Sequence, residues 1–128
     1  MKTIIKSDSL AAPVGPFSAG TGFERLIFTS GQVGQLPVSG CLAGDDLDAQ
    51  ARQALKNLLT VVEAGGGSRK TILKVNCWLL DMADFSAFNA VYKEFFGNDS
   101  FPARTCIAVA QLPMGAKVEV EAVAYRRD

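Results

Sequence analysis

The stretch that decides the fold is residues 73–79, which read Leu-Lys-Val-Asn-Cys-Trp-Leu. In it Leu73, Val75, Cys77 and Leu79 alternate with Lys74, Asn76 and Trp78. A period of two is typical of a strand that buries one of its faces. The segments on both sides of this strand repeat their apolar residues with the period of a helix, so we expect a sheet covered by helices.

Residues 47–62 and 85–96 are the two predicted helices, because apolar side chains recur in both at helical spacing. Three aspartates within residues 45–48 supply a capping side chain and negative charge where the first helix begins. The glycines of residues 65–67 end this helix. The second helix carries a broad, largely aromatic face and stops at Gly97. Each helix therefore has an apolar stripe to bury.

Residues 25–30, 105–110 and 117–125 predict further strands. Residues 31–44 carry four glycines and a proline, which predicts a turn with weak pairing. The order of elements indicates an α+β protein, with a mixed sheet and both helices packed on one face. In the last strand the acidic residues, among them Glu119, lie opposite the small apolar ones. The second sheet face is thus only partly polar, and an oligomer could cover it.

The chain has 128 residues, which predicts one domain spanning residues 1–128. Basic and acidic residues number 13 each, and no basic stripe marks a nucleic-acid-binding protein, so we do not expect nucleic acid as a partner. No apolar run approaches the ~20 residues of a membrane helix, and no apolar core of a signal peptide is present. The predicted location is the cytoplasm, with an organelle such as the mitochondrion as the alternative.

The absence of histidine excludes Ser-His-Asp and Cys-His catalysis and histidine-based metal sites. General acid–base chemistry then falls to Asp, Glu, Lys, Tyr, Cys or bound water. Cys41, Cys77 and Cys106 are widely spaced, so neither a disulfide framework nor a zinc site is expected.

Arg104 is the first candidate for a ligand site. Residues 102–106 read Pro-Ala-Arg-Thr-Cys, and in a strand Arg104 and Cys106 point to the same face. A guanidinium can grip a carboxylate with two parallel hydrogen bonds. The alternative is a structural ion pair with a nearby carboxylate. Cys106 is either a nucleophile activated by Arg104 or a small buried apolar side chain.

Glu119 and Glu121 form a second candidate, because they share one face of the last strand. Two neighbouring carboxylates raise one another's pKa and suit general acid–base work. The alternative is a solvated strand face. Glu119 would lie next to Arg104 if the strands that carry them pair.

Six stretches, taken in order, are similar to the RidA (YjgF-type) reactive intermediate deaminase family over nearly the whole chain. They are residues 12–17, 29–32, 50–57, 89–96 and 101–106, and the tail formed by residues 112–113 and 118–122. The most specific is Phe-Pro-Ala-Arg-Thr-Cys at residues 101–106.

This resemblance implies a chorismate-mutase-like α+β fold assembled as a homotrimer, with the sheets forming an inner barrel and ligand sites in clefts between subunits. It implies hydrolysis of reactive enamines and imines, such as 2-aminoacrylate and 2-iminobutyrate, to 2-keto acids and ammonia. The substrate is a small carboxylate, and no metal or organic cofactor is implied.

The resemblance also implies roles for particular residues. Arg104 matches a bidentate carboxylate clamp, and the backbone of Gly31 and Cys106 would supply polar contacts near the ligand. Glu119 matches the residue that orients or activates the attacking water. Ser30 and Asn89 match positions that line or brace the cleft.

Phe17 departs from the family pattern, in which active members usually carry tyrosine near the ligand. Phenylalanine keeps the aromatic wall and loses the hydroxyl. A non-catalytic trimer that binds small carboxylates, as a metabolite sensor or partner-binding protein, is therefore the second hypothesis. A ribonuclease or translation inhibitor is the third, and neutral charge and the lack of histidine argue against it.

Overall fold

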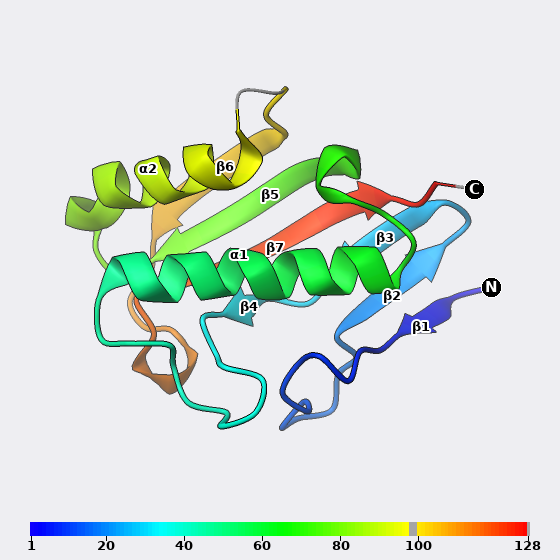
Figure 1. Ribbon diagram of the computed structural model, residues 1–128, viewed down its shortest axis with the longest axis horizontal. Helices are drawn as coiled ribbons and strands as arrows, with labels where there is room; N and C mark the ends of the chain where they lie inside the picture. The colour runs from blue at the N-terminus through cyan, green and yellow to red at the C-terminus, as the bar shows by residue number, and fades with distance from the viewer. Residues whose placement is uncertain (98–99, 128) are drawn as a thin grey trace.

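The computed structural model describes residues 1–97 and 100–127. A seven-stranded sheet has the order β1-β2-β3-β7-β5-β6, and β4 also pairs with β7. The strands are β1 (Thr3–Ile5), β2 (Gly20–Phe23), β3 (Leu26–Thr29), β4 (Gln32–Val33), β5 (Ile72–Leu79), β6 (Ala103–Ala108) and β7 (Val118–Tyr125). The helices are α1 (Leu47–Ala64) and α2 (Phe85–Phe96), with short 3-10 turns η1 (Arg69–Thr71), η2 (Met82–Asp84) and η3 (Pro113–Gly115). Figure 1 shows both helices crossing the sheet.

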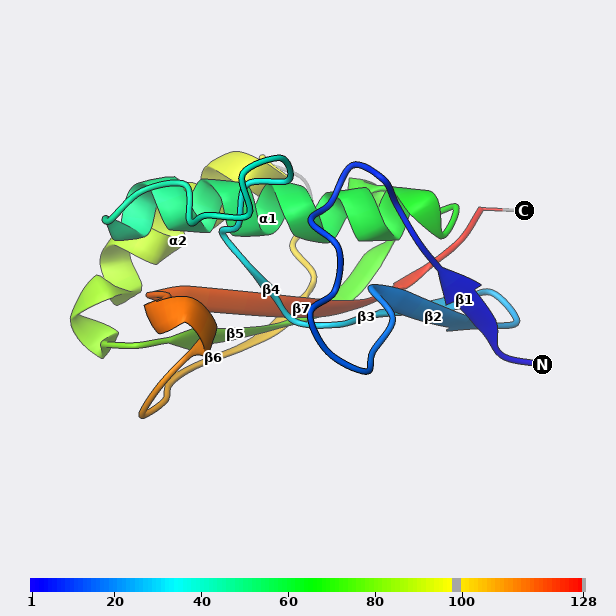
Figure 2. The ribbon, with the colours of Figure 1, turned by 90° about the horizontal axis from the view of Figure 1, so that it is seen from below.

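Both helices lie on the same side of the sheet, as Figure 2 shows in edge view. The core between them is formed by side chains such as Leu58 of α1, Phe88 of α2 and Val75 of β5, all of them fully buried. This confirms the predicted α+β class, with a mixed sheet and two helices on one face. The sheet is mixed because β5 and β6 are parallel, whereas the other neighbours are antiparallel.

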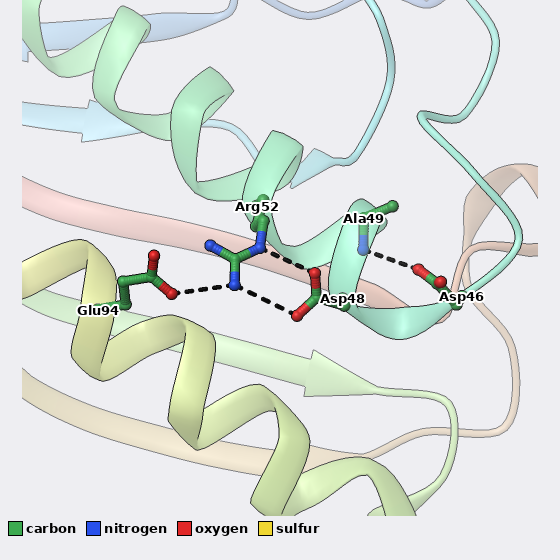
Figure 3. A network of polar contacts seen from close by, with 5 residues as sticks. All are labelled: Asp46, Asp48, Ala49, Arg52 and Glu94. Atoms are coloured by element: carbon green, nitrogen blue, oxygen red, sulfur yellow. Dashed lines mark hydrogen bonds and ion pairs between the residues drawn. The ribbon is translucent and has the colours of Figure 1, made fainter.

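The start of α1 follows the prediction from its aspartates. The Asp46 carboxylate caps the helix by accepting a hydrogen bond of 2.8 Å from the backbone N–H of Ala49. One turn later, Arg52 pairs with Asp48 of the same helix at 2.8 Å and with Glu94 of α2 at 2.9 Å (Figure 3). These ion pairs are exposed and contribute little stability each, but they join the two helices on their solvent side.

The predicted strand at residues 105–110 begins earlier in the structure, at Ala103. Parallel pairing with β5 starts at Lys74 opposite Ala103, so Arg104 lies within β6 rather than before it. The turn predicted for residues 31–44 contains only the two-residue β4 and an isolated bridge between Gln35 and Leu42. The expected weak pairing of that stretch is confirmed.

The second sheet face carries no α-helix among the described residues (Figure 2). Phe28 and Ile107 alternate with core residues on their strands and are 42% and 49% exposed. Half-buried Trp78, Val123 and Tyr125 alternate with core residues in the same way. The face is therefore substantially apolar. Within the described ranges, neither helix has the length and apolar character to cross a membrane.

Candidate functional site

Arg104 is held by one face of α2. In β6 it lies opposite the fully buried Val75, so its side chain points into the helix layer. The guanidinium carbon lies 4.8 Å from the ring centroid of Tyr92, 5.6 Å from that of Phe85 and 5.9 Å from that of Phe88. Its Nη1 donates a 2.8 Å hydrogen bond to Oδ1 of Asn89. These four partners recur at helical spacing, and together they fix the orientation of the cation.

No carboxylate pairs with Arg104 anywhere in the described part of the chain. The ion pair found on α2, that of Glu94, belongs instead to Arg52 of α1. The alternative of a structural ion pair for Arg104 is therefore wrong within that part. A guanidinium has five N–H donors, and the bond to Asn89 occupies one of them. Arg104 also lines a cavity of about 370 Å³, together with Lys93, Phe101 and Pro102.

Cys106 shares this face with Arg104, as predicted, and packs against the core. Its register partner on β5 is Cys77. Burial raises the pKa of the Cys106 thiol, and Arg104 opposes this only in part. Burial raises the pKa of the Cys77 thiol to about 12. A protonated thiol is a poor nucleophile, so the apolar interpretation of Cys106 is favoured over the nucleophile.

Glu119 lies on the opposite sheet face. Its neighbours Val118 and Val120 are fully buried beneath the helices, so Glu119 points away from them. Burial raises the pKa of the Glu119 carboxyl, and the nearby Glu121 raises it further. Glu121 itself accepts a 3.0 Å hydrogen bond from Nδ2 of Asn76. The predicted effect of a neighbouring carboxylate is therefore present at Glu119, with burial as the larger cause.

Gly31 allows the closest approach to Glu119. A Cβ atom at position 31 would lie 2.5 Å from Oε2 of Glu119, so a side chain there would require the carboxylate to move from this position. The neighbouring Ser30 donates a hydrogen bond of 2.6 Å from its Oγ to the carbonyl oxygen of Ser18. Its backbone N–H donates another to the carbonyl oxygen of Ala19. These bonds fix the loop that carries Phe17, a residue that is 51% exposed.

A cavity of about 630 Å³ joins Phe17, Ser30, Gly31 and Glu119. The predicted site residues thus fall into two groups on opposite faces of the sheet. The Arg104 group contains Arg104, Asn89 and Cys106, and the Glu119 group contains the four residues of this cavity.

The hypothesis that the strands carrying Arg104 and Glu119 pair with each other is wrong. β5 lies between β6 and β7, so those two strands do not pair with each other. The spatial order of strands depends on the crossover through α2, which periodicity along the chain does not reveal. The rings of Phe85, Phe88 and Tyr92 were predicted only as core. Their spacing with Asn89 on one stripe of α2 was the signal that they surround a polar group.

The fold and its two groups define an α+β protein with two cavities at a helix-covered mixed sheet, one lined by Arg104 and the other by Glu119. A family model described as endoribonuclease L-PSP matches residues 8–126. A Salmonella typhimurium protein named 2-iminobutanoate/2-iminopropanoate deaminase is 40% identical, and the alignment covers 99% of this chain and 100% of that protein. The chain belongs to the YjgF/RidA family.

Solved structures agree over the whole fold. The YjgF gene product of Escherichia coli superposes with a TM-score of 0.92 at 39% identity, covering 98% of this chain and 99% of that one. Escherichia coli TdcF with bound serine superposes with a TM-score of 0.93 at 36% identity, with the same coverage.

Proposed function

We propose that this chain is a hydrolytic deaminase that converts reactive 2-enamine and 2-imine acids, such as 2-aminoacrylate and 2-iminobutyrate, to 2-keto acids and ammonia. The observation that carries the proposal is Arg104, an oriented guanidinium that lines a cavity and has no carboxylate partner in the described chain. Such a group suits bidentate binding of a small carboxylate. The Salmonella typhimurium protein whose name states this chemistry aligns with the chain over its own full length.

The working form in this proposal is a homotrimer with its sheets forming an inner barrel and its sites between subunits. Two observations support it. The helix-free sheet face exposes apolar residues such as Phe28 and Ile107, which a closed assembly would bury. Arg104 and Glu119 lie on opposite faces of their own chain, so they can share a ligand only if it lies between two copies.

In the proposed reaction Arg104 binds the substrate carboxylate, and backbone groups of Cys106 and Gly31 provide further polar contacts. Glu119 orients a water molecule toward the imine carbon and accepts a proton from it as the C–O bond forms. Glu119 then returns this proton to the nitrogen of the carbinolamine. The C–N bond breaks and ammonia leaves, while the hydroxyl gives its proton to water and becomes the keto oxygen. Asn89 positions Arg104, Ser30 fixes the loop, and Phe17 forms an aromatic wall. Only side chains, backbone and water take part.

A non-catalytic carboxylate-binding trimer is the second candidate, because Phe17 provides no hydroxyl to hold a proton or water. The ribonuclease in the name of the family model receives less support here, since the chain has no histidine and no net positive charge. The three cysteines are free thiols, which suits the reducing cytoplasm as the place of action.

The test is release of 2-ketobutyrate from 2-iminobutyrate, generated in situ by a threonine dehydratase. Wild type should accelerate release, and Arg104→Ala should lose about 10²–10³ in kcat/KM, because the substrate carboxylate then lies without its partner. The matched control is Arg52→Ala, which removes an exposed arginine that lines neither cavity. Rates equal to background for wild type would overturn the deaminase. Binding of 2-ketobutyrate without turnover would then favour the carboxylate-binding trimer.

A further inference from the structure

The cavity of about 630 Å³ that Glu119 lines has a largely apolar wall. Leu10, Phe17 and Met114 contribute side chains to it, and Phe17 and Met114 are each 51% exposed. Met114 adopts a left-handed backbone conformation, with φ 62° and ψ 15°, in the turn before β7. A left-handed conformation is unfavourable for a residue other than glycine, asparagine or aspartate, and such positions concentrate where a protein positions a functional side chain.

Most polar side chains of the same wall are already occupied by the protein itself. Asn57 donates to the carbonyl oxygens of Val33 and Gln35 at 3.1 and 2.9 Å and accepts a bond from Gln53. Ser30 bonds to Ser18 at 2.6 Å. These groups support the loops around the cavity and leave few donors or acceptors for a ligand.

Gln35 and Glu121 are occupied in the same way. Gln35 donates through Nε2 to the carbonyl oxygen of Gly40 at 2.9 Å, and Glu121 accepts from Asn76 at 3.0 Å. Gln32 also lines the cavity, and its register partner on β7 is Val120. Among the described residues, Glu119 is the carboxylate of this cavity that accepts no hydrogen bond from the protein, so it is the acidic group open to the reacting atoms.

We propose that this wall selects 2-imino acids with large apolar side chains, with Leu10, Phe17 and Met114 as specificity-determining residues. The inference rests on the proposed function. An imine carbon carries a carboxylate, a nitrogen and a side chain. If Arg104 holds the carboxylate and Glu119 serves the carbon, the side chain is the part that meets the wall.

The energetics favour aliphatic, thioether and aromatic side chains over polar ones of equal size. An apolar side chain gains by leaving water. A polar side chain loses its water hydrogen bonds and finds no replacement at Leu10, Phe17 or Met114. The volume of about 630 Å³ also leaves space for side chains much larger than those of alanine- or serine-derived imines.

The experiment compares two imines of nearly equal shape, derived from leucine and asparagine by an L-amino-acid oxidase in the presence of catalase. Wild type should show a kcat/KM about tenfold or more higher for the leucine-derived imine, after correction for uncatalysed hydrolysis. Met114→Gln and Phe17→Tyr each place a polar group in the wall, and each should lower this leucine-to-asparagine ratio severalfold. Ratios compared between variants cancel the intrinsic reactivity of the two imines.

The matched control is Met82→Gln, the same substitution at a side chain that is 44% exposed and outside the cavity. It should leave the ratio unchanged. Equal kcat/KM values for both imines in wild type, or a ratio that Met114→Gln and Phe17→Tyr do not move, would overturn the inference while the deaminase stands. Absence of catalysis with every imine would overturn the proposed function and this inference with it.

Discussion

The Arg104 group and the Glu119 group are built in different ways. Arg104 is held by side chains from a single helix, α2, which is connected directly to its strand. Glu119 lies beside Gly31 and lines the same cavity as Phe17, and both of these residues belong to the first third of the chain. The first group is set by local packing, whereas the second depends on loops and on long-range pairing of β4 with β7.

The difference also concerns charge. The Arg104 side presents a cation surrounded by aromatic rings, and the Glu119 side presents a half-buried carboxylate whose pKa is raised. Each face alone has one half of what imine hydrolysis requires: a grip on the carboxylate, or a base for water. Two copies of the chain offer complementary halves to each other, which makes assembly a condition of activity in this proposal.

The strongest expected effect on the Glu119 side comes from Glu119→Gln, which keeps the shape and removes the base. We expect kcat/KM for 2-iminobutyrate to fall about 10²–10³-fold, the range of general acid–base catalysis. Because burial raises the pKa of Glu119, the acid limb of the wild-type pH–rate profile should lie above the range of an exposed glutamate. That limb should vanish from the residual activity of the variant.

The same variant should gain stability at neutral pH. A carboxyl whose pKa is raised on folding binds its proton more tightly in the folded state, so folding becomes less favourable as pH rises from the unfolded pKa, about 4.3, through the folded one. At a pH above the folded pKa, wild type carries the full cost of burying the charged Glu119 carboxylate. The Glu119→Gln variant has no such charge and does not carry that cost. Thermal unfolding should therefore show a higher Tm for the variant at pH 7 and no difference at low pH. An inactive variant with lowered Tm at pH 7 would point to misfolding instead.

The next effect tests directly whether the two halves come from different copies. Arg104→Ala and Glu119→Gln should each be nearly inactive alone, but together they should recover activity after joint unfolding and refolding. Random assembly of equal amounts in a closed ring pairs an intact Arg104 with an intact Glu119 at about one site in four. Recovery of roughly that fraction of wild-type activity is the expected result, measured as 2-ketobutyrate release.

Each variant refolded separately, and wild type refolded in the same way, are the controls for this mixture. A mixture no more active than its parts would mean that the site lies within one copy, contrary to the opposite placement of the two groups on the sheet.

Much of this fold could be predicted from periodicity and punctuation. The alternation in β5 and β7, the aspartate cap of α1 and the stop of α2 at Gly97 are local signals, and the structure places those elements within a few residues of the predicted bounds. Arg104 could be singled out as a candidate site residue because it also lies in a contiguous motif, Pro-Ala-Arg-Thr-Cys at residues 102–106.

The relation of Arg104 to Glu119 could not be predicted, because it depends on strand order. β5 separates the two strands, and a crossover of one helix decides that arrangement. The partner rings on α2 were read as core because stacking on a cation and packing in a core require the same apolar spacing. Tyr92 serves both: its ring contacts Arg104 and also Phe96, at centroid distances of 4.8 and 4.7 Å.

The smallest expected effect comes from Tyr92→Phe, which distinguishes the role of the Tyr92 ring beside Arg104 from the role of its hydroxyl. Its Oη is buried and makes no hydrogen bond with the described residues, and a buried donor without a partner costs about 1–3 kcal/mol. Tyr92→Phe keeps the ring over the guanidinium and removes that cost, so Tm should rise by a few degrees while KM for 2-iminobutyrate stays within about twofold. Tyr125→Phe, at a half-buried tyrosine on the uncovered face, is the control for loss of a phenol. A lower Tm in Tyr92→Phe, together with a raised KM, would show that the hydroxyl rather than the ring holds the Arg104 side in place.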